Sequence, residues 1–152
     1  MNFELLKEKH SFEISFSTEG TEIITTENIN LLSLLSDLKK LPEFEFDFLV
    51  SICANDLIDE NKFELYYTLY SLSTNKTIII KTNCSRETAK LPSIQSLYKS
   101  AHFEEREIFD LFGIKFDGKS ISRRLLLPND WIGHPLRKDY TLQDERLDWN
   151  KR

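Results

Sequence analysis

The stretch Phe63-Glu-Leu-Tyr-Tyr-Thr-Leu-Tyr-Ser-Leu72 carries aromatic side chains at both odd and even positions. A strand with large side chains on both faces is expected to be covered on two sides. Two further strands are predicted beside it, over Phe44–Cys53, where phenylalanine alternates with acidic residues, and over the β-branched stretch Thr77–Lys81. The polar connection Asn55–Asn61 and the turn residues Thr74–Lys76 separate the three strands.

A hairpin and a short helix are predicted before these strands. Ser11–Ser17 alternates apolar and polar residues, the period-two pattern of a half-buried strand, and Thr21–Thr26 is a second β-branched strand. Glu19-Gly20 supplies the turn between the two strands. The short helix is predicted over Asn2–His10, before the hairpin.

A second helix is predicted after the hairpin, because apolar residues recur there on one broad face. These residues are Ile29, Leu31, Leu32, Leu34, Leu35 and Leu38. Thr26 and Asn28 are both candidates to cap its start, and it ends before Pro42. The order α-β-β-α-β-β-β predicts a two-layer α+β domain, with helices against one face of a mixed sheet. We assign residues 1–90 to this body.

The sequence pattern changes after Lys90. Leu91-Pro92-Ser93 predicts a break, and Ser100–Phe112 predicts a helix closed by Gly113, because glycine readily adopts the left-handed conformation that follows a helix. Beyond Asp117-Gly118, large apolar residues persist without any regular period. Such a segment is expected to lie against another surface. We therefore assign residues 91–152 to a helix and an extended segment that docks onto other proteins.

The composition favours one globular domain. The chain has 152 residues, 40% of them hydrophobic and 30% charged, which is typical of a folded soluble domain. No stretch approaches the ~20 apolar residues needed to cross a bilayer. The N-terminus lacks the pattern of an export signal. We therefore expect membrane association only through a partner protein.

The cysteine and histidine residues argue against a metal centre. Two cysteines, Cys53 and Cys84, cannot supply the four thiolates of an iron–sulfur cluster or of an all-cysteine zinc site. His10, His102 and His134 lack the spacing that places two imidazoles on one helix face. The sequence predicts two reduced structural cysteines.

The charge is unevenly distributed along the chain. Residues 1–100 hold 10 basic and 15 acidic residues, whereas residues 101–152 hold 10 of each. Within Lys115–Lys138, six basic residues stand against Asp117 and Asp130 alone. This basic stretch predicts an electrostatically guided contact. Nucleic-acid binding is the alternative, but the sequence pI of about 5.3 disfavours it.

Three motifs in the second half occur in a fixed order. They are Glu105-Arg-Glu-Ile-Phe-Asp-Leu-Phe-Gly-Ile-Lys-Phe116, Arg123-Arg-Leu-Leu-Leu127 and Trp131-Ile-Gly-His-Pro-Leu-Arg-Lys-Asp-Tyr140. Together with Lys62–Tyr67 and Leu91–Ala101, this combination closely resembles the C subunit of NADH:quinone oxidoreductase, respiratory complex I, including its mitochondrial and plastid or cyanobacterial counterparts. The resemblance covers the chain from about residue 30 onward. Ordered motifs are more specific than any single short pattern.

The chain departs from the family pattern at a few positions. Phe103 stands where the family usually has tryptophan, Lys119-Ser120 where it often has His-Pro, and Thr141 where it commonly has proline. An aromatic and a basic residue are kept at the first two places. We expect the tail contacts of longer relatives to be missing, because the sequence lacks their long C-terminal extension.

The resemblance implies a component of the hydrophilic arm, bound beside the quinone-site (D-type) subunit and the iron–sulfur subunits. It would lie at the cytoplasmic face of a bacterial plasma membrane, or on the matrix or stromal side for an organelle-encoded chain. Family members carry no redox group, although the complex uses NADH, FMN, iron–sulfur clusters and quinone. The chain is therefore expected to be a non-catalytic part of a proton-pumping enzyme. The equivalent subunit of a membrane-bound hydrogenase or of a ferredoxin-dependent photosynthetic complex is the alternative.

The motifs define the candidate site, which we expect to be an interface with neighbouring subunits. Its residues are Glu105, Arg106, Glu107, Asp110, Gly113, Lys119, Arg123, Arg124, Trp131, Gly133, His134, Pro135, Arg137, Lys138, Asp139, Tyr140 and Trp149. The carboxylates could form an acid/base group, but an ion pair between Arg106 and Asp110, four residues apart on one helix face, is the simpler interpretation. Glu107 is expected near the apolar side of that helix.

The basic and aromatic motif residues have competing interpretations. The arginines of Arg123-Arg124 and of Arg137-Lys138 are either solvated or paired with acidic groups of a partner, and we prefer the partner. Trp131 is either a core or an interface residue, whereas Trp149, near the end of the chain, is expected to be an interface anchor. His134, between Gly133 and Pro135, is expected to be a turn residue with a satisfied hydrogen bond.

Overall fold

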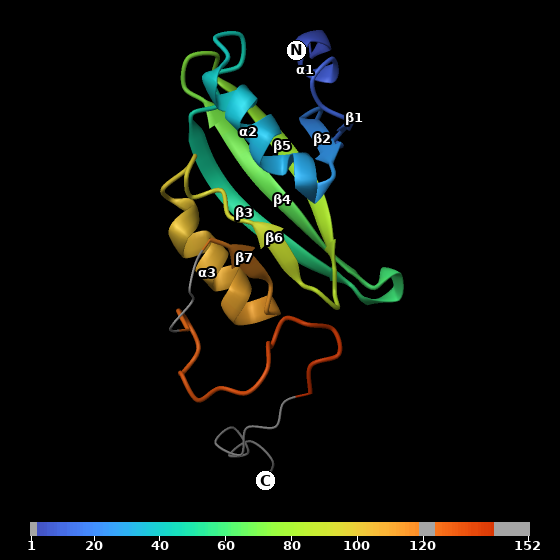
Figure 1. Cartoon of the computed structure of the whole chain (residues 1–152), viewed down its shortest axis with the longest axis vertical. Coiled ribbons are helices and arrows are strands. Elements are labelled where there is room, and N and C mark those ends of the chain that lie inside the picture. The colour runs from blue at the N-terminus through green and yellow to red at the C-terminus, as the bar shows by residue number, and fades with distance from the viewer. Residues whose placement is uncertain (1–2, 119–123, 142–152) are drawn as a thin grey trace.

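A computed structural model describes residues 3–118 and 124–141 and shows a five-stranded sheet beside two longer helices (Figure 1). The strands pair in the order β1-β2-β5-β4-β3, all antiparallel except for the parallel pair β2 and β5. The sheet is therefore mixed, as predicted. The strands are β1 (Phe12–Phe16), β2 (Glu22–Thr26), β3 (Phe48–Leu57), β4 (Lys62–Ser71) and β5 (Lys76–Ser85).

The helices confirm the predicted order of elements. They are α1 (Glu4–Lys7), α2 (Leu31–Lys40) and α3 (Ala101–Phe112), with single 3-10 turns η1 (Asn28–Asn30) and η2 (Ile58–Glu60). Helices α2 and α3 lie on the same side of the sheet (Figure 1). The helices and main strands before residue 90 thus follow the order α-β-β-α-β-β-β of a two-layer α+β domain. Among the described residues, no helix is long and apolar enough to cross a membrane.

The central strand β4 places the core on one side of the sheet. Its inward residues Phe63, Leu65, Tyr67 and Leu69 are fully buried, whereas alternate residues such as Tyr66 are only half-buried. The prediction that both faces of this strand are covered was therefore wrong. On the outer face the large side chains contact each other, since Lys81 of β5 lies over the Tyr66 ring at 5.6 Å.

Strand β3 begins and ends later than predicted. Phe44 and Phe46 are buried, but they belong to a loop in which Phe44 stacks on Phe3 at 5.5 Å. The Tyr98 hydroxyl donates to the carbonyl oxygen of Phe46 at 2.7 Å. The alternation of phenylalanine there reflects a loop folded into the core. At the other end, pairing continues to Leu57, because the polar residues predicted as a connection still pair with β4.

One short strand precedes α3 in the sequence, and another follows it. β6 (Lys90–Pro92) pairs in parallel with β7 (Lys115–Asp117). The break predicted over residues 91–93 was therefore wrong at its start, because Leu91 is buried and belongs to a strand of this two-stranded sheet. The predicted end of α3 was correct, since Gly113 has the left-handed φ of 76°.

The predicted cap of the second helix was also wrong. The N-cap position of α2 is Asn30, which makes no side-chain cap hydrogen bond, and the turn η1 precedes it. Thr26 instead donates through its hydroxyl to the carbonyl oxygen of Ser11 at 3.3 Å. A polar residue near a helix start is an ambiguous signal when a 3-10 turn can lead into the helix.

Candidate docking site at the C-terminal end of helix α3

Residues 124–141, which we call the docking segment, lie against the C-terminal end of α3, at the end of the molecule opposite α1 (Figure 1). The last four carbonyl oxygens of a helix lack partners within the helix. The Gly113 amide donates to Phe109 O at 2.8 Å. The docking segment supplies donors for the other three carbonyl oxygens. Arg124 Nη1 and His134 Nδ1 donate to Asp110 O at 3.1 and 3.0 Å. The Leu136 amide donates to Leu111 O at 3.0 Å, and Arg137 Nε donates to Phe112 O at 2.6 Å.

Asp110 fixes the start of the docking segment. Its fully buried carboxylate accepts the backbone amides of Leu125, Leu126 and Leu127 at 3.0, 2.7 and 2.9 Å. It also accepts Arg124 Nη1 at 2.8 Å. Burial alone would raise the pKa of Asp110, but these hydrogen bonds hold it below its ordinary value. Asp110 is therefore an ionised anchor at neutral pH.

Arg124 neutralises Asp110 and joins distant parts of the segment. Its Nη2 donates to the carbonyl oxygens of Trp131 and Gly133, both at 2.9 Å. The predicted pair of Asp110 with Arg106 was wrong, because Arg124 takes that place and Arg106 donates to the Arg124 carbonyl oxygen at 3.4 Å. A cation here also interacts favourably with the negative end of the helix dipole.

Arg137 turns back onto the body as Arg124 does. Its guanidinium lies over the Phe63 ring at 5.2 Å, while its Nε binds the carbonyl oxygen of Phe112. The interpretation of Arg124 and Arg137 as groups that reach out to a partner's acids therefore needs correction. Both guanidinium groups are engaged within their own chain, where desolvated carbonyl oxygens need donors. Arg123, Lys119 and Trp149 lie outside the described residues.

The two motif glycines are required by close packing. Gly113 has a positive φ, and a Cβ there would lie 2.5 Å from the His134 ring and 2.7 Å from Arg137 Nη2. Gly133 has a φ of 82°, and a Cβ there would lie 2.8 Å from the Tyr140 ring. Any side chain at either position would combine backbone strain with a clash.

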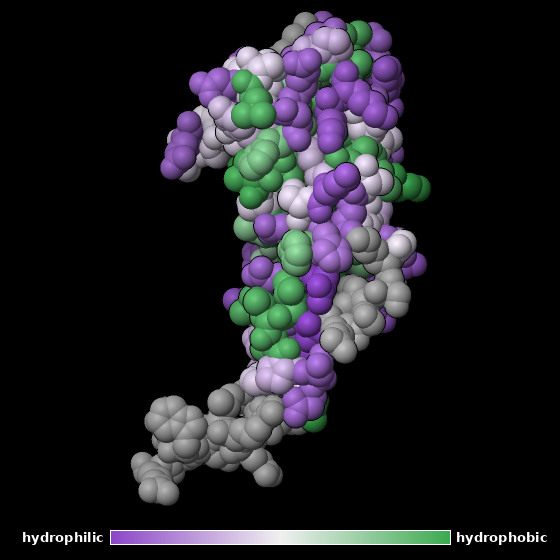
Figure 2. All heavy atoms as spheres, turned by 90° about the vertical axis from the view of Figure 1, so that its left-hand side faces the viewer, coloured by the Kyte–Doolittle hydropathy of each residue, from purple (hydrophilic) through white to green (hydrophobic). Residues whose placement is uncertain are grey.

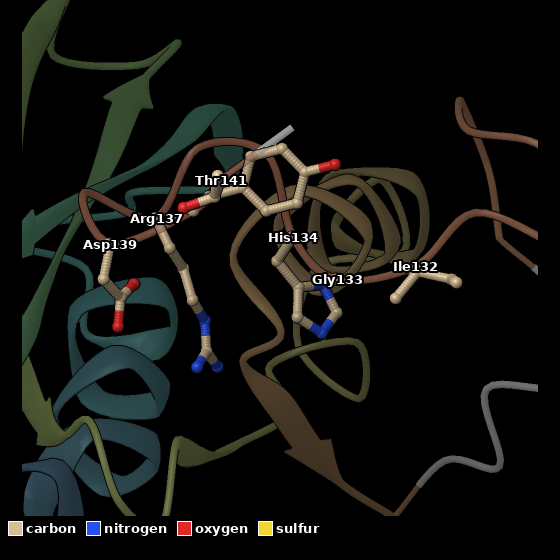
Figure 3. Close-up of a pocket in the computed structure, with 7 residues that line it drawn as sticks. Ile132, Gly133, His134, Arg137, Asp139 and Thr141 are labelled. Atoms are coloured by element: carbon tan, nitrogen blue, oxygen red, sulfur yellow. The ribbon is translucent and has the colours of Figure 1, made fainter. Parts of the chain in front are cut away.

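His134 completes the contact with the helix end. As predicted, it is a turn residue with a satisfied hydrogen bond, because Nδ1 binds the carbonyl oxygen of Asp110. Burial and the nearby charges of Arg137 and Arg124 lower the pKa of His134, which keeps the imidazole neutral. Figure 3 shows the side chains of His134, Arg137 and Asp139 on one side of the backbone, around an open pocket that Ile132 also lines.

A second anchor ties the end of the docking segment to the sheet. The buried carboxylate of Asp56 on β3 accepts Arg86 Nε at 2.7 Å and the Lys138 amide at 2.8 Å. Arg86 also reaches Asp139 at 2.8 Å. Sequence analysis missed Asp56 and Arg86. The sequence offered no signal for Asp56, because it fell in the predicted connection Asn55–Asn61. Its buried position on β3 shows why its charge needs a partner.

The burial of the carboxylates on α3 differs from the prediction. Glu105, not Glu107, is buried, and it accepts Ser93 Oγ at 2.8 Å, the Ile94 amide at 2.8 Å and Gln95 Nε2 at 2.7 Å. Glu107 is exposed, so the expectation that it lies near the apolar side was wrong. Glu105 therefore holds the turn that leads into α3, and its bonds have a structural role.

Three large aliphatic side chains of the docking segment are exposed, among exposed polar residues such as Asp130 and Lys138. Leu126, Ile132 and Leu136 are exposed, whereas Trp131 and Tyr140 are half-buried. The Trp131 indole nitrogen is buried and finds no hydrogen-bond partner among the described residues. Within residues 3–118 and 124–141, no group of three or more His, Cys, Asp and Glu side chains is placed to hold a metal ion. The docking segment thus exposes aliphatic side chains beside polar ones, while Arg124 and Arg137 hold its backbone against the end of α3.

The comparisons with known proteins agree on one family. The family model described as "Respiratory-chain NADH dehydrogenase, 30 Kd subunit" matches residues 24–146. The chain is 40% identical over 115 residues to the NADH-quinone oxidoreductase C subunit of Moorella thermoacetica, covering 76% of each protein. It is 40% identical to the corresponding C subunit of a Roseiflexus species, covering 72% of this chain and 64% of the relative. The NADH-quinone oxidoreductase C/D subunit of Chromohalobacter salexigens is 33% identical over 92% of this chain and 25% of the relative.

Two solved structures share the fold. The trypsin-resistant fragment (1-134) of Nqo5 is 25% identical, with a TM-score of 0.66 over 78% of this chain and 97% of that one. A chain of the membrane-bound sulfane sulfur reductase, an archaeal respiratory membrane complex, is 22% identical. It has a TM-score of 0.79 over 92% of this chain and 83% of that one, and this likeness shows the fold alone.

Proposed function

Because the chain belongs to the family of the respiratory-chain NADH dehydrogenase 30 Kd subunit, we propose that it serves NADH-quinone oxidoreductase as a non-catalytic structural part of the peripheral arm. In this proposal the chain carries no cofactor, and NADH, FMN, iron–sulfur clusters and quinone are handled by its neighbours. Its contribution is geometric, because electron carriers must be held at fixed positions and rigid contacts make those positions reproducible.

The proposal rests on one observation: the motif residues are engaged in hydrogen bonds that hold the chain's own backbone. Asp110, Arg124, His134 and Arg137 all bind backbone atoms or each other at the end of α3. Groups tied up in this way support a shape rather than a reaction. The shape that they support presents three exposed aliphatic side chains on a segment without regular secondary structure. A pre-ordered apolar surface loses little entropy on binding and is well suited to a permanent interface.

The D-type, quinone-site subunit is the partner that we propose for this surface, with the iron–sulfur subunits nearby. Support comes from the relative whose name joins C and D, in which the part that matches this chain is 25% of one longer polypeptide. Parts joined in one chain are held at high effective concentration and commonly share an interface. We place the complex at the cytoplasmic face of a bacterial membrane, reached by this chain through its partners. The division into a body (1–90) and a docking part (91–152) remains part of the proposal.

The test compares two isoleucines of nearly equal exposure. Ile132 in the docking segment is 77% exposed, and Ile29 beside α2 is 80% exposed. Ile132→Asp should leave the thermal stability of the isolated chain within the error of the control while reducing recovery of NADH-oxidising and D-type subunits with a tagged chain from native membranes. Ile29→Asp should change neither. Equal recovery with both variants would reject the docking surface.

The second candidate function is the equivalent subunit of a membrane-bound hydrogenase or of a ferredoxin-dependent complex. The likeness to a chain of the sulfane sulfur reductase, another respiratory membrane complex, is compatible with this candidate through the fold alone. The same affinity purification separates the two. Co-purification of a flavoprotein that oxidises NADH supports the first proposal, and a hydrogenase or ferredoxin-binding subunit in its place supports the second.

A further inference from the structure

The pocket in the docking segment is lined by two side chains whose hydrogen-bonding capacity is only partly used. Figure 3 shows the His134 ring and the Arg137 guanidinium pointing the same way into this pocket. The two groups are neighbours, because a Cβ on Gly113 would lie 2.6 Å from His134 Nε2 and 2.7 Å from Arg137 Nη2. One incoming group can therefore reach both nitrogens.

His134 offers an acceptor to the pocket. Its Nδ1 lies 3.0 Å from the carbonyl oxygen of Asp110, which can only accept, so Nδ1 carries the proton of the neutral ring. Burial and the charges of Arg137 and Arg124 lower the pKa of His134 and keep the ring in this form at neutral pH. Nε2 thus keeps its lone pair, and it has no hydrogen-bond partner within residues 3–118 and 124–141.

Arg137 offers a donor beside that acceptor. Its Nε binds the carbonyl oxygen of Phe112, and its guanidinium lies over the Phe63 ring. These contacts leave the N–H groups of its Nη atoms without a hydrogen bond to the part of the chain that the structure describes. The chain thus holds the guanidinium in place while its Nη donors face the pocket.

From these two atoms we propose that the pocket receives one uncharged polar side chain of the neighbouring D-type subunit, which donates to His134 Nε2 and accepts from Arg137 Nη2. The inference rests on the proposed function, which supplies the neighbour. A hydroxyl or a carboxamide can donate and accept at once. A carboxylate cannot donate and would face the carboxylate of Asp139 in the same pocket, while a lysine or arginine would face the charge of Arg137.

The surface around the pocket suits such a side chain. Figure 2 shows hydrophobic and hydrophilic residues side by side at the end of the molecule where the docking segment lies. Ile132 lines the pocket and is 77% exposed, so it can cover the aliphatic atoms of the incoming side chain. Protein interfaces combine apolar contacts of this kind with hydrogen bonds that fix the orientation of the partner.

The test is a competition between two differently tagged chains for incorporation into the complex in native membranes. The ratio of variant to wild type in the assembled complex, divided by their ratio in the whole extract, measures the loss. His134→Asn keeps a donor for the Asp110 carbonyl oxygen but lacks Nε2, and Arg137→Lys keeps the charge but lacks the Nη donors. Each should be incorporated about tenfold less than the wild type, because a polar group of the partner is left unpaired. His102→Asn, at the other end of α3, should compete equally.

The double variant tests whether one group binds both nitrogens. Bonds to one shared group are coupled, so the combined loss should stay well below the product of the two single losses. A full product indicates two separate groups and overturns the inference, as does wild-type incorporation of both single variants. A carbodiimide joins an amine to a carboxylate, so a product between subunits at position 137 in Arg137→Lys would identify an acidic partner and reject the uncharged one.

A pair of tryptophan variants keeps the test independent of the hydrogen bonds that hold the segment. Thr141→Trp fills the pocket from its exposed rim and should lower incorporation, whereas Thr74→Trp, in an exposed turn, should not. Equal incorporation of the two rejects the pocket even where His134→Asn or Arg137→Lys destabilises the chain. Loss with Ile132→Asp but with none of the pocket variants rejects this inference and leaves the proposed function. No loss with any variant rejects both.

Discussion

Replacing Asp110 by alanine tests whether one buried carboxylate holds the docking segment. The substitution removes the acceptor for three backbone amides and for the guanidinium of Arg124. If the segment stayed in place, an unpaired charge would remain buried, which costs about 3–5 kcal/mol. If the segment detached, water would reach Arg124 and the loss of global stability would be smaller. Detachment would instead expose the chain after Arg124, Arg137 and Lys138 to trypsin.

The assay therefore pairs urea unfolding with limited trypsin digestion of the isolated chain. We expect Asp110→Ala to lower the free energy of unfolding by up to that amount, or to speed cleavage within residues 124–141, or both. Glu107→Ala is the matched control, because Glu107 is an exposed carboxylate on the same helix, and surface changes usually stay within about 0.5 kcal/mol. Wild-type stability together with wild-type cleavage in Asp110→Ala would refute the reasoning.

The same anchor predicts a dependence on pH. The pKa of Asp110 lies below its ordinary value of 3.8 in the folded chain, so its contribution to stability is fully present above that value. The contribution is lost as the pH falls from that value through the lower pKa of the folded state. Unfolding measured between neutral pH and acid should therefore show a steeper loss below about pH 3.8 in the wild type than in Asp110→Ala. Two further substitutions have matched controls within the chain. Gly113→Ala combines a left-handed backbone, which costs about 1 kcal/mol, with overpacking against His134, which costs about 1–3 kcal/mol more. Gly118→Ala has the same backbone strain, but its Cβ would meet no atom of the described residues within 4 Å, so the urea midpoint of Gly118→Ala should fall less. Tyr67→Phe should leave stability unchanged or raise it, because the Tyr67 hydroxyl is buried and finds no partner among the described residues. Tyr98→Phe loses a hydrogen bond of 2.7 Å to a backbone carbonyl and should cost about 1 kcal/mol; a larger loss in Tyr67→Phe than in Tyr98→Phe would contradict the assignment.

The order of elements could be predicted from the sequence because periodicity is a local property. The hairpin, α2, β4 and the end of α3 at Gly113 all rest on patterns within about ten residues. The same local reasoning failed over Phe44–Phe46, where alternation came from a loop packed into the core. Period two is produced by any extended chain with one buried side, and only hydrogen bonding distinguishes a strand from such a loop.

The motifs predicted a site that includes Asp110, Arg124 and Arg137, but the contacts of these residues could not be predicted. Arg124 binds Asp110, 14 positions away, and Arg137 binds the Phe112 carbonyl oxygen, 25 positions away, across a segment without a period. Nothing in local spacing says that Arg124 turns inward. Asp56 and Arg86 belong to no motif, and only the folded sheet brings them to Asp139. Burial of charge is a tertiary property that propensity does not report.

The bond from the Lys138 amide to Asp56 joins residues 82 positions apart. Contacts of such long sequence separation form slowly, because the intervening chain must be ordered first. We therefore expect this contact between the docking segment and β3 to form last during folding, after the hairpins and α3 are complete. Until it closes, Leu126, Ile132 and Leu136 are carried on a loose tail. Closure fixes the place of these three side chains but leaves them exposed, so only a partner surface can cover them.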